Sequence, residues 1–307
     1  MKQITKEEGP RMKKTGAQII LEILMEHGVD TVFGYPGGAA LNVYDALYEY
    51  QDRIKHVLTA HEQGASHAAD GYARATGKTG VVFATSGPGA TNLVTGIATA
   101  YMDSIPMVAI TSNVADSLIG RDAFQEIYIT GITMPITKHN FFVNRIEDLA
   151  DAMREAFRIA QSGRKGPVLV DVTKDVTAAM IEYVPGEPLP LKEMPKAAEE
   201  ELKQVAAAIN QAKCPVLYCG GGAASRQAEK ELHALMETAD IPAAHTMMAA
   251  GLVPHDDERS LGMIGMHGSV TANEALFHAD MVLALGTRFS DRVALNIEKF
   301  SPGAVKI

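Results

Sequence analysis

The stretch GVVFATSGPGATN, residues 80–92, joins an apolar run to a glycine-rich turn and the start of a helix. Gly80 to Ala84 is apolar throughout, which is typical of a parallel strand that is buried on both faces. The turn Ser86-Gly87-Pro88-Gly89 follows, and we predict a helix from there through Ala100, because proline is well tolerated in the first helical turn. The stretch therefore predicts one strand–turn–helix unit of an α/β fold.

The same alternation continues on both sides of this stretch. Apolar runs of strand length alternate with segments whose apolar residues recur at helical spacing, which predicts a parallel sheet covered by helices on both faces. Upstream we predict a first helix with the stripe Ile19, Ile20, Ile23, Leu24 and His27, which is ended by Gly28. It is followed by a strand at Thr31–Phe33, a helix at Leu41–Tyr50, a strand at Ile54–Leu58 and a helix from Glu62 to Gly77. Downstream we predict a strand at Pro106–Ile110, an irregular stretch at Thr111–Asn144, a helix carrying Leu149, Met153, Phe157 and Ala160, and a strand at Pro167–Val172.

A composition shift divides the chain. Four prolines between Glu182 and Pro195 indicate an extended linker. A second strand–helix block follows it, with predicted strands at Pro215–Tyr218 and Met281–Leu285. We therefore expect a polar N-terminal tail at residues 1–12, a first domain at 13–180, a linker at 181–197 and a second, Rossmann-like domain at 198–307.

The overall charge and the cysteine count exclude several classes of protein. Lys and Arg number 28 against 37 Asp and Glu, so the net charge is −9, which does not suit a nucleic-acid-binding protein. No apolar run reaches the roughly 18 residues of a membrane span, and Met1–Lys14 has no signal-peptide core. Two cysteines cannot form a disulfide framework. We expect a cytoplasmic protein that binds neither nucleic acid nor membrane.

Several familiar motifs fail on spacing. Gly71 and Gly77 are separated by five residues where a P-loop needs four, and the segment ends a predicted helix. His61 and His67 are six apart, so they point to different sides of a helix and cannot share a zinc ion. Gly87-Pro88-Gly89 has no third glycine at the spacing of a dinucleotide fingerprint. The sequence therefore disfavours nucleotide hydrolysis, a zinc protease and nicotinamide binding.

Three other features each follow a predicted strand, where parallel sheets bind their ligands. They are the turn Gly34-Tyr35-Pro36-Gly37-Gly38, the acidic Glu62, and the segment Ser86–Asn92. Taken singly, these features are equally typical of a tight turn, an acidic first helical turn and a helix start with proline. Taken together, they predict a ligand site at one edge of the sheet.

In this order, the segments resemble the pyrimidine-binding domain of thiamine-diphosphate enzymes, and more narrowly the large catalytic subunits of acetohydroxyacid (acetolactate) synthases. The resemblance runs from about Lys13 to Ile307. It is carried by residues 32–39, 61–65, 71–74, 85–92, 122–126, 166–171, 265–268 and 288–293.

This resemblance implies a reaction and a set of partners. Pyruvate would be decarboxylated on thiamine diphosphate, and the two-carbon unit would join a second 2-ketoacid, pyruvate or 2-ketobutyrate, in branched-chain amino-acid biosynthesis. Residues 13–180 would be the pyrimidine-binding domain, and 198–307 a truncated central domain associated with FAD. The family's third domain, which holds Mg²⁺ and the diphosphate, is not recognisable here, so we expect no metal ligands in this chain and no activity of the chain alone. We also expect a homodimer or tetramer, with a small regulatory subunit as a possible partner.

The resemblance also assigns roles to residues of the first domain and to one residue of the second. Glu62 would bind the aminopyrimidine ring and activate the cofactor, with Gly38 and Gln125 as further catalytic residues. Phe124 and Arg292 would contact the second substrate. Thiamine diphosphate would be bound by Tyr35, Pro36, Gly37, Gly38, Glu62, Pro88 and Asn92.

A second set of residues falls on the flavin-contacting segments of the family, where backbone N–H groups at glycine turns suit a diphosphate. Ser290 departs from the pattern, because the family usually has an aspartate there, so FAD is less firmly implied than thiamine diphosphate. The set comprises Arg164, Gly220, Gly221, Gly222, Thr246, Met247, Met266, His267, Gly268, Gly286, Thr287 and Arg288.

Two alternatives stay open at this point. The first is another thiamine-diphosphate decarboxylase or carboligase that acts on 2-ketoacids; Phe124, Gln125 and Arg292 argue against it. The second is a non-catalytic protein that binds flavin or a partner; Glu62 argues against it, because a pure binding module has no need of that carboxylate.

Overall fold

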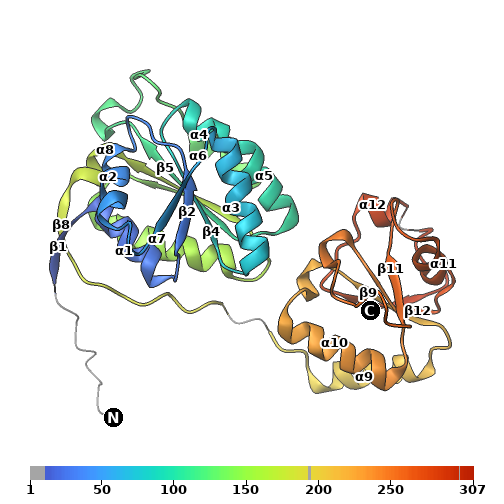
Figure 1. Cartoon of the computed structure of the whole chain (residues 1–307). Coiled ribbons are helices and arrows are strands. Elements are labelled where there is room, and N and C mark those ends of the chain that lie inside the picture. The colour runs from blue at the N-terminus through green and yellow to red at the C-terminus, as the bar shows by residue number, and fades with distance from the viewer. Residues whose placement is uncertain (1–10, 193–194, 297) are drawn as a thin grey trace, which may run out of the picture. The chain divides into compact units, whose positions relative to one another are not determined.

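Strand β4 (Gly80–Ala84) lies inside a six-stranded parallel sheet, and all five of its residues are buried. The computed structural model describes residues 11–192, 195–296 and 298–307. The chain divides into two units, Met1–Met194 and Pro195–Ile307, and each has its own parallel sheet between helices (Figure 1). The predicted α/β class is thereby confirmed. The strand order of the first sheet is β3 (Lys55–Leu58), β2 (Thr31–Gly34), β4, β5 (Met107–Asn113), β7 (Pro167–Thr173), β6 (His139–Val143).

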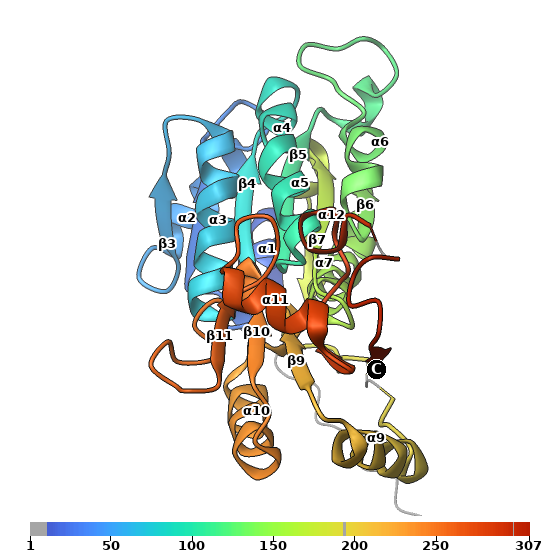
Figure 2. The same cartoon turned by 90° about the vertical axis from the view of Figure 1, so that its right-hand side faces the viewer.

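Helices cover both faces of this sheet, as the fully apolar strands require (Figure 2). On one face, α1 (Gly16–Glu26), α2 (Leu41–Glu49) and α7 (Ile146–Gln161) share a core with β4, β5 and β7. On the other face lie α3 (Glu62–Thr76) and α5 (Val94–Asp103). The shorter helical elements of this unit are α4 (Pro88–Asn92), α6 (Ile129–Thr133), α8 (Lys174–Ala178) and the 3-10 turns Asp116–Leu118 and Met134–Ile136.

The predicted limits of the first helix follow from its end residues. Thr15 caps the amino end of α1, where its hydroxyl accepts a hydrogen bond from the backbone N–H of Gln18 and the Gln18 side chain bonds back. After α1, Gly28 has φ +67°, a conformation that glycine adopts without strain. The Thr15 cap therefore starts the helix, and the helix ends just before Gly28, as the sequence predicted.

The predicted linker and tail boundaries are wrong by a few residues. Met180–Tyr183 forms β8, which pairs antiparallel with β1 (Met12–Thr15), so residues 181–183 and Met12 belong to the first unit. Each strand has four residues of mixed polarity, and the two partners lie more than 160 residues apart, so no local pattern marks them. Strand β6 was missed for a related reason: it is an edge strand, and its sequence His-Asn-Phe-Phe-Val is not a continuous apolar run.

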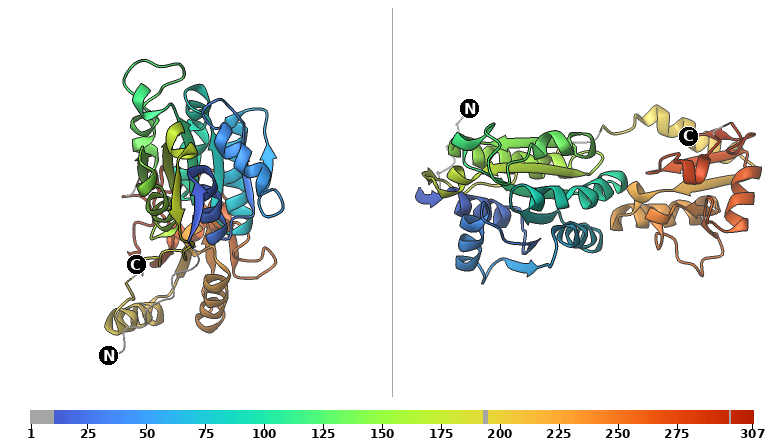
Figure 3. Two further views of the ribbon diagram at one scale, coloured as in Figure 1. Left: turned by 90° about the vertical axis from the view of Figure 1, so that its left-hand side faces the viewer. Right: turned by 90° about the horizontal axis from the view of Figure 1, so that it is seen from above.

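The second unit has a five-stranded parallel sheet with the order β11-β10-β9-β12-β13. Figure 3 shows the strands and helices of this unit from two further sides. Helices α9 and α10 cover one face, and α11 and α12 cover the other. Among the residues described, no helix has the length and apolar character that a membrane crossing requires. The elements are α9 (Glu199–Gln211), β9 (Pro215–Cys219), a 3-10 turn (Gly221–Ala223), α10 (Arg226–Ala239), β10 (Ala243–His245), a 3-10 turn (Met247–Ala249), β11 (Ser260–Met263), α11 (Val270–His278), β12 (Met281–Leu285), α12 (Asp291–Ala294) and β13 (Val305–Lys306).

A buried carboxyl group joins two central strands of the first sheet. Asp171 on β7 is 2% exposed, and its two oxygens accept hydrogen bonds from the Thr111 hydroxyl at 2.6 Å and the Asn113 amide at 2.7 Å, both on β5. Burial raises the pKa of Asp171 to about 6, against the opposing effect of these two hydrogen bonds. The charged form is therefore disfavoured in the folded protein.

We predict that Asp171 makes the stability of the first unit fall as pH rises. Its folded-state pKa lies above the unfolded value of about 3.9, so the contribution is fully present below about pH 4 and is lost as pH rises through about 6. Between these pH limits the free energy of unfolding of the wild type should fall by about 3 kcal/mol relative to that of Asp171→Asn, which cannot ionise. Urea unfolding at a series of pH values measures this difference. A stability difference that stays constant from pH 4 to pH 7 would contradict the prediction.

Candidate active site

Glu62 is the first residue of α3 and is only 7% exposed. The preceding His61 is extended and caps the helix, with its Nδ1 accepting a hydrogen bond from the backbone N–H of Gln63 at 3.1 Å. A carboxylate in the first turn interacts favourably with the helix dipole. The same position also keeps the carboxylate out of water, at the carboxyl-terminal edge of the sheet.

A single side chain orients the Glu62 carboxylate. Asn92, the last residue of α4, donates a hydrogen bond from Nδ2 to Glu62 Oε2 at 2.9 Å. Within the described ranges, no other residue donates a hydrogen bond to this carboxylate. Because a buried carboxylate has about four acceptor positions, Glu62 can still accept hydrogen bonds from a ligand.

Glycines let the surrounding segments approach this carboxylate. A Cβ atom at Gly89 would lie 2.7 Å from Thr85 Cγ2 and 3.2 Å from Glu62 Oε1. A Cβ atom at Gly96 on α5 would lie 2.0 Å from the Ser66 hydroxyl oxygen on α3. Larger residues at these positions would push α4 and α5 away from α3, and Asn92 would then be moved from Glu62.

The turn after β2 packs against the turn after β4. A Cβ atom at Gly37 would lie 2.4 Å from Thr85 Cγ2, and the Thr85 hydroxyl accepts a hydrogen bond from the Ala39 N–H at 3.3 Å. Gly38 differs, because a Cβ atom there would meet nothing within 4 Å. Gly37 is thus required by protein packing, whereas the exposed Tyr35, Pro36 and Gly38 leave space beside the turn.

The loop between β5 and α6 also contacts the turn after β4. A Cβ atom at Gly87, which has φ +59°, would lie 2.7 Å from Gln125 Cβ. Gln125 therefore packs against the turn that leads to Asn92. Phe124 beside it is 86% exposed, so the first unit alone gives it no pocket.

The strand order explains why these segments meet. The connection after β2 runs to β3 on one side, and the connection after β4 runs to β5 on the other side, so the turns after β2 and β4 diverge. Ligands of open α/β sheets bind at such topological switch points. A flat ring with hydrogen-bond donors fits the features found here: a buried carboxylate with unused acceptor positions and a glycine that leaves open space.

Tyr44 was missed by the sequence analysis, which placed it only within a predicted helix. Its hydroxyl oxygen lies 2.6 Å from where a Gly34 Cβ would be, and it has no hydrogen-bond partner among the described residues. Burial and the Glu62 charge raise the pKa of Tyr44. No feature of the sequence separates such a residue from an ordinary core tyrosine.

In the second unit, most of the predicted flavin segments follow neighbouring strands. Gly220–Gly222 follows β9, Thr246–Met247 follows β10, Met266–Gly268 comes after β11, and Gly286–Arg288 follows β12. The sheet order reverses direction between β9 and β12, so this edge is also a topological switch point. The structure thus gathers these segments at the edge where a cofactor is expected.

The glycine turns there are not free to act as predicted. The N–H groups of Gly220 and Gly222 donate to the carbonyl oxygens of Leu285 and Gly286 at 2.9 and 2.8 Å, so they do not point to a diphosphate. A Cβ atom at Gly220 would lie 2.4 Å from Thr287 Cα. These glycines allow the two turns to touch, which is a packing requirement.

Arg164 lies apart from both clusters, and the two residues predicted to contact the second substrate lie on different units. Arg164 belongs to the first unit and donates a hydrogen bond to the Ser104 hydroxyl at 2.7 Å; it precedes β7, at the sheet edge opposite Glu62. Arg292 belongs to the second unit, where its carbonyl oxygen accepts a hydrogen bond from the Met266 N–H at 2.8 Å. Phe124 and Arg292 are therefore on different units.

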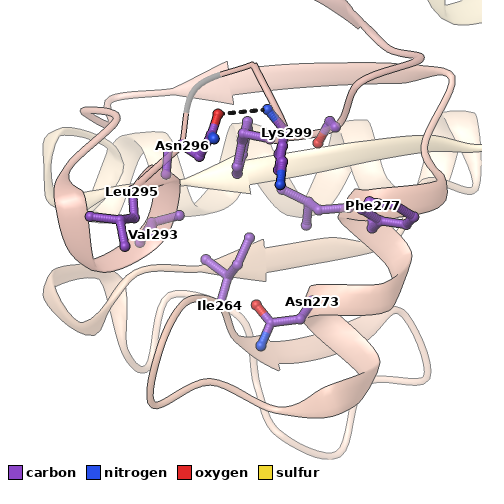
Figure 4. A pocket seen from close by; sticks show the side chains of 11 residues that line it. Ile264, Asn273, Phe277, Val293, Leu295, Asn296 and Lys299 are labelled. Atoms are coloured by element: carbon purple, nitrogen blue, oxygen red, sulfur yellow. Dashed lines mark hydrogen bonds between the residues drawn. The ribbon is translucent and has the colours of Figure 1, made fainter.

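A pocket of about 250 Å³ in the second unit contains none of the predicted site residues (Figure 4). It lies between α11 and the segment that follows α12. Its labelled lining residues are Ile264, Asn273, Phe277, Val293, Leu295, Asn296 and Lys299.

Comparison with known families agrees with this architecture. Residues 14–132 match the N-terminal TPP-binding domain of thiamine pyrophosphate enzymes, and residues 202–307 match the central domain of the same enzymes. The first match contains Glu62, Asn92 and Gln125, and the second contains the glycine turns of the second unit.

Curated relatives are close in sequence. The chain is 50% identical over 295 residues to the acetolactate synthase large subunit of Corynebacterium glutamicum, covering 95% of this chain and 47% of the relative. It is 51% identical over 293 residues to the acetolactate synthase large subunit of Mycobacterium tuberculosis, covering 94% of this chain and 47% of that relative. The chain thus spans about half the length of the curated relatives it matches. With both family domains matched in order, the chain belongs to the thiamine pyrophosphate enzymes and is similar to the first half of acetolactate synthase large subunits.

Proposed function

We propose that the chain is part of an acetolactate synthase, which decarboxylates pyruvate on thiamine diphosphate and joins the two-carbon unit to a second 2-ketoacid, pyruvate or 2-ketobutyrate. The observation that carries the proposal is the buried Glu62 carboxylate, oriented by Asn92 and left with acceptor positions for a ligand. About 50% identity to acetolactate synthase large subunits supports this reaction over other chemistries of the family.

When bound, thiamine diphosphate supplies the electron sink for decarboxylation. Glu62 would hold a proton at its carboxylate, shared with the aminopyrimidine ring of the cofactor, and Asn92 would fix the direction of that hydrogen bond. Gly38 and its neighbours would let backbone approach the ring closely, because no Cβ atom intervenes. The remaining contacts to thiamine diphosphate would come from Tyr35, Pro36, Gly37 and Pro88.

Three side chains would handle the substrates. Gln125, held beside Gly87, would donate hydrogen bonds near the reacting carbons. Phe124 would line the site of the second 2-ketoacid, and Arg292 would pair with its carboxylate through two parallel hydrogen bonds. Mg²⁺ and the diphosphate would be held outside residues 1–307, in the part of the relatives that this chain does not match. We further propose a homodimer or tetramer, with a small regulatory subunit as an additional partner, in the cytoplasm.

FAD is proposed for the second unit. The switch point between β9 and β12 fits a dinucleotide, and the four segments that follow β9, β10, β11 and β12 would line it. Gly220 and Gly222 would let the two turns that line the site pack against each other, since their N–H groups are already bonded and the Gly286–Thr287 backbone lies beside them. The other residues proposed for this site are Gly221, Thr246, Met247, Met266, His267, Gly268, Gly286, Thr287 and Arg288. Arg164, to which the resemblance also assigns a flavin contact, belongs to the first unit.

We predict that Glu62→Gln lowers synthase activity at least 100-fold with little effect on folding, because only the proton-holding group is lost. The protein should be expressed from the complete reading frame that contains these 307 codons. Exchange of the thiamine C2 proton and acetolactate formation measure the effect. Asp45→Asn, an exposed carboxylate on α2, is the matched control. Normal C2 exchange in Glu62→Gln would refute the role of Glu62.

We predict that the same protein binds FAD through its second unit. FAD should raise the unfolding temperature of that unit, because a ligand that binds only the folded state stabilises it. Arg288→Ala should weaken this shift, and Lys203→Ala on the exposed face of α9 should not. A purified protein without flavin absorbance and without an FAD-dependent shift would exclude the flavin site.

We predict that residues 1–307 alone form no acetolactate from pyruvate, even with saturating thiamine diphosphate and Mg²⁺. Glu62 would have no partner group that fixes the cofactor diphosphate opposite it. A colorimetric assay for acetolactate, with the complete reading-frame product as positive control, gives the answer. Product formation by the 307-residue chain would show that the diphosphate site lies within it.

A further inference from the structure

The loop between β5 and α6, which lies beyond the end of the sheet in Figure 2, is closed by one side chain. The Glu126 carboxylate accepts a hydrogen bond from the Gly120 N–H on one oxygen, and from the Ala123 N–H at 2.9 Å on the other. The Glu126 N–H also donates to the Ala123 carbonyl oxygen at 2.9 Å. Residues 120–126 therefore form a ring that is closed by Glu126.

This ring contains two residues in an unfavourable conformation. Asp122 has φ +52° and Gln125 has φ +61°, in the left-handed region that costs a non-glycine residue about 1 kcal/mol or more. Such conformations persist only where surrounding contacts hold them. Glu126 supplies contacts on one side of Gln125, and the backbone of Gly87 supplies them on the other.

We propose that Glu126 is a positioning residue for the reaction proposed above: by closing the 120–126 ring it fixes Gln125 against Gly87, beside the carboxylate site. The inference rests on the proposed function for its kinetic consequence, whereas the closure of the ring rests on the hydrogen bonds alone.

The chemistry of the side chain suits this task. An ionised carboxylate accepts hydrogen bonds at both oxygens and donates none, which matches two backbone donors. The hydrogen bonds from Gly120, Ala123 and Arg121 lower the pKa of Glu126, which keeps the acceptor ionised. Glutamine in the same place has one acceptor oxygen and would set its NH₂ group against the second donor.

The test compares Glu126→Ala and Glu126→Gln with wild type, expressed from the complete reading frame. Displacing Gln125 by about 1 Å should lower kcat by 10- to 100-fold, with KM for pyruvate changed less than about threefold. Glu126→Gln, which keeps one acceptor, should fall between wild type and Glu126→Ala. Glu147→Gln, an exposed carboxylate on α7, should match wild type.

A second readout does not depend on activity. In NMR spectra of the 307-residue chain, the amide resonances of Gly120, Ala123 and Gln125 should move in both variants, while those of the sheet stay in place. Unchanged resonances would overturn the ring closure. An active wild type with an equally active Glu126→Ala would overturn the positioning role alone. A wild type that forms no acetolactate would overturn the proposed function, and the positioning role with it.

Discussion

The arrangement of the first unit depends on how a carboxylate is kept out of water. Among the described residues, Asn92 alone donates a hydrogen bond to the Glu62 carboxylate, and that bond joins two helices that follow different strands. It forms only because Gly89 and Gly96 lack side chains, so that α4 and α5 can lie against α3. A charged group with one partner is costly to bury, and the remaining acceptor positions are what make the site able to recognise a ligand.

Both units have a topological switch point in their sheet, but the residues at the two switch points differ. In each sheet the connections after two neighbouring strands run in opposite directions from the carboxyl edge; these strands are β2 and β4 in the first sheet and β9 and β12 in the second. In the first unit the edge carries an acid and an amide. In the second it carries glycine turns that are locked to each other through Gly220, Gly222 and Gly286. The first edge thus presents a buried hydrogen-bond acceptor, and the second presents backbone turns packed against each other.

Sequence reasoning reached the parts of this structure that local patterns encode. The apolar runs at 80–84 and 281–285 are strands, and Glu62 begins a helix where predicted. Pairing of β1 with β8 was missed, because two short mixed strands meet only through the tertiary fold. The N–H groups of Gly220 and Gly222 are already bonded within the protein, which composition cannot show. Contact between Gln125 and Gly87 likewise depends on a long loop that has no periodicity.

The two neighbouring glycines of the first turn face different constraints. A side chain at residue 37 would collide with Thr85, so the fold itself excludes it. A Cβ atom at residue 38 would meet nothing within 4 Å among the described residues. The fold therefore constrains residue 37 and leaves residue 38 free to vary in size. The surface beside the turn can thus change shape at one position while the adjacent position preserves the packing.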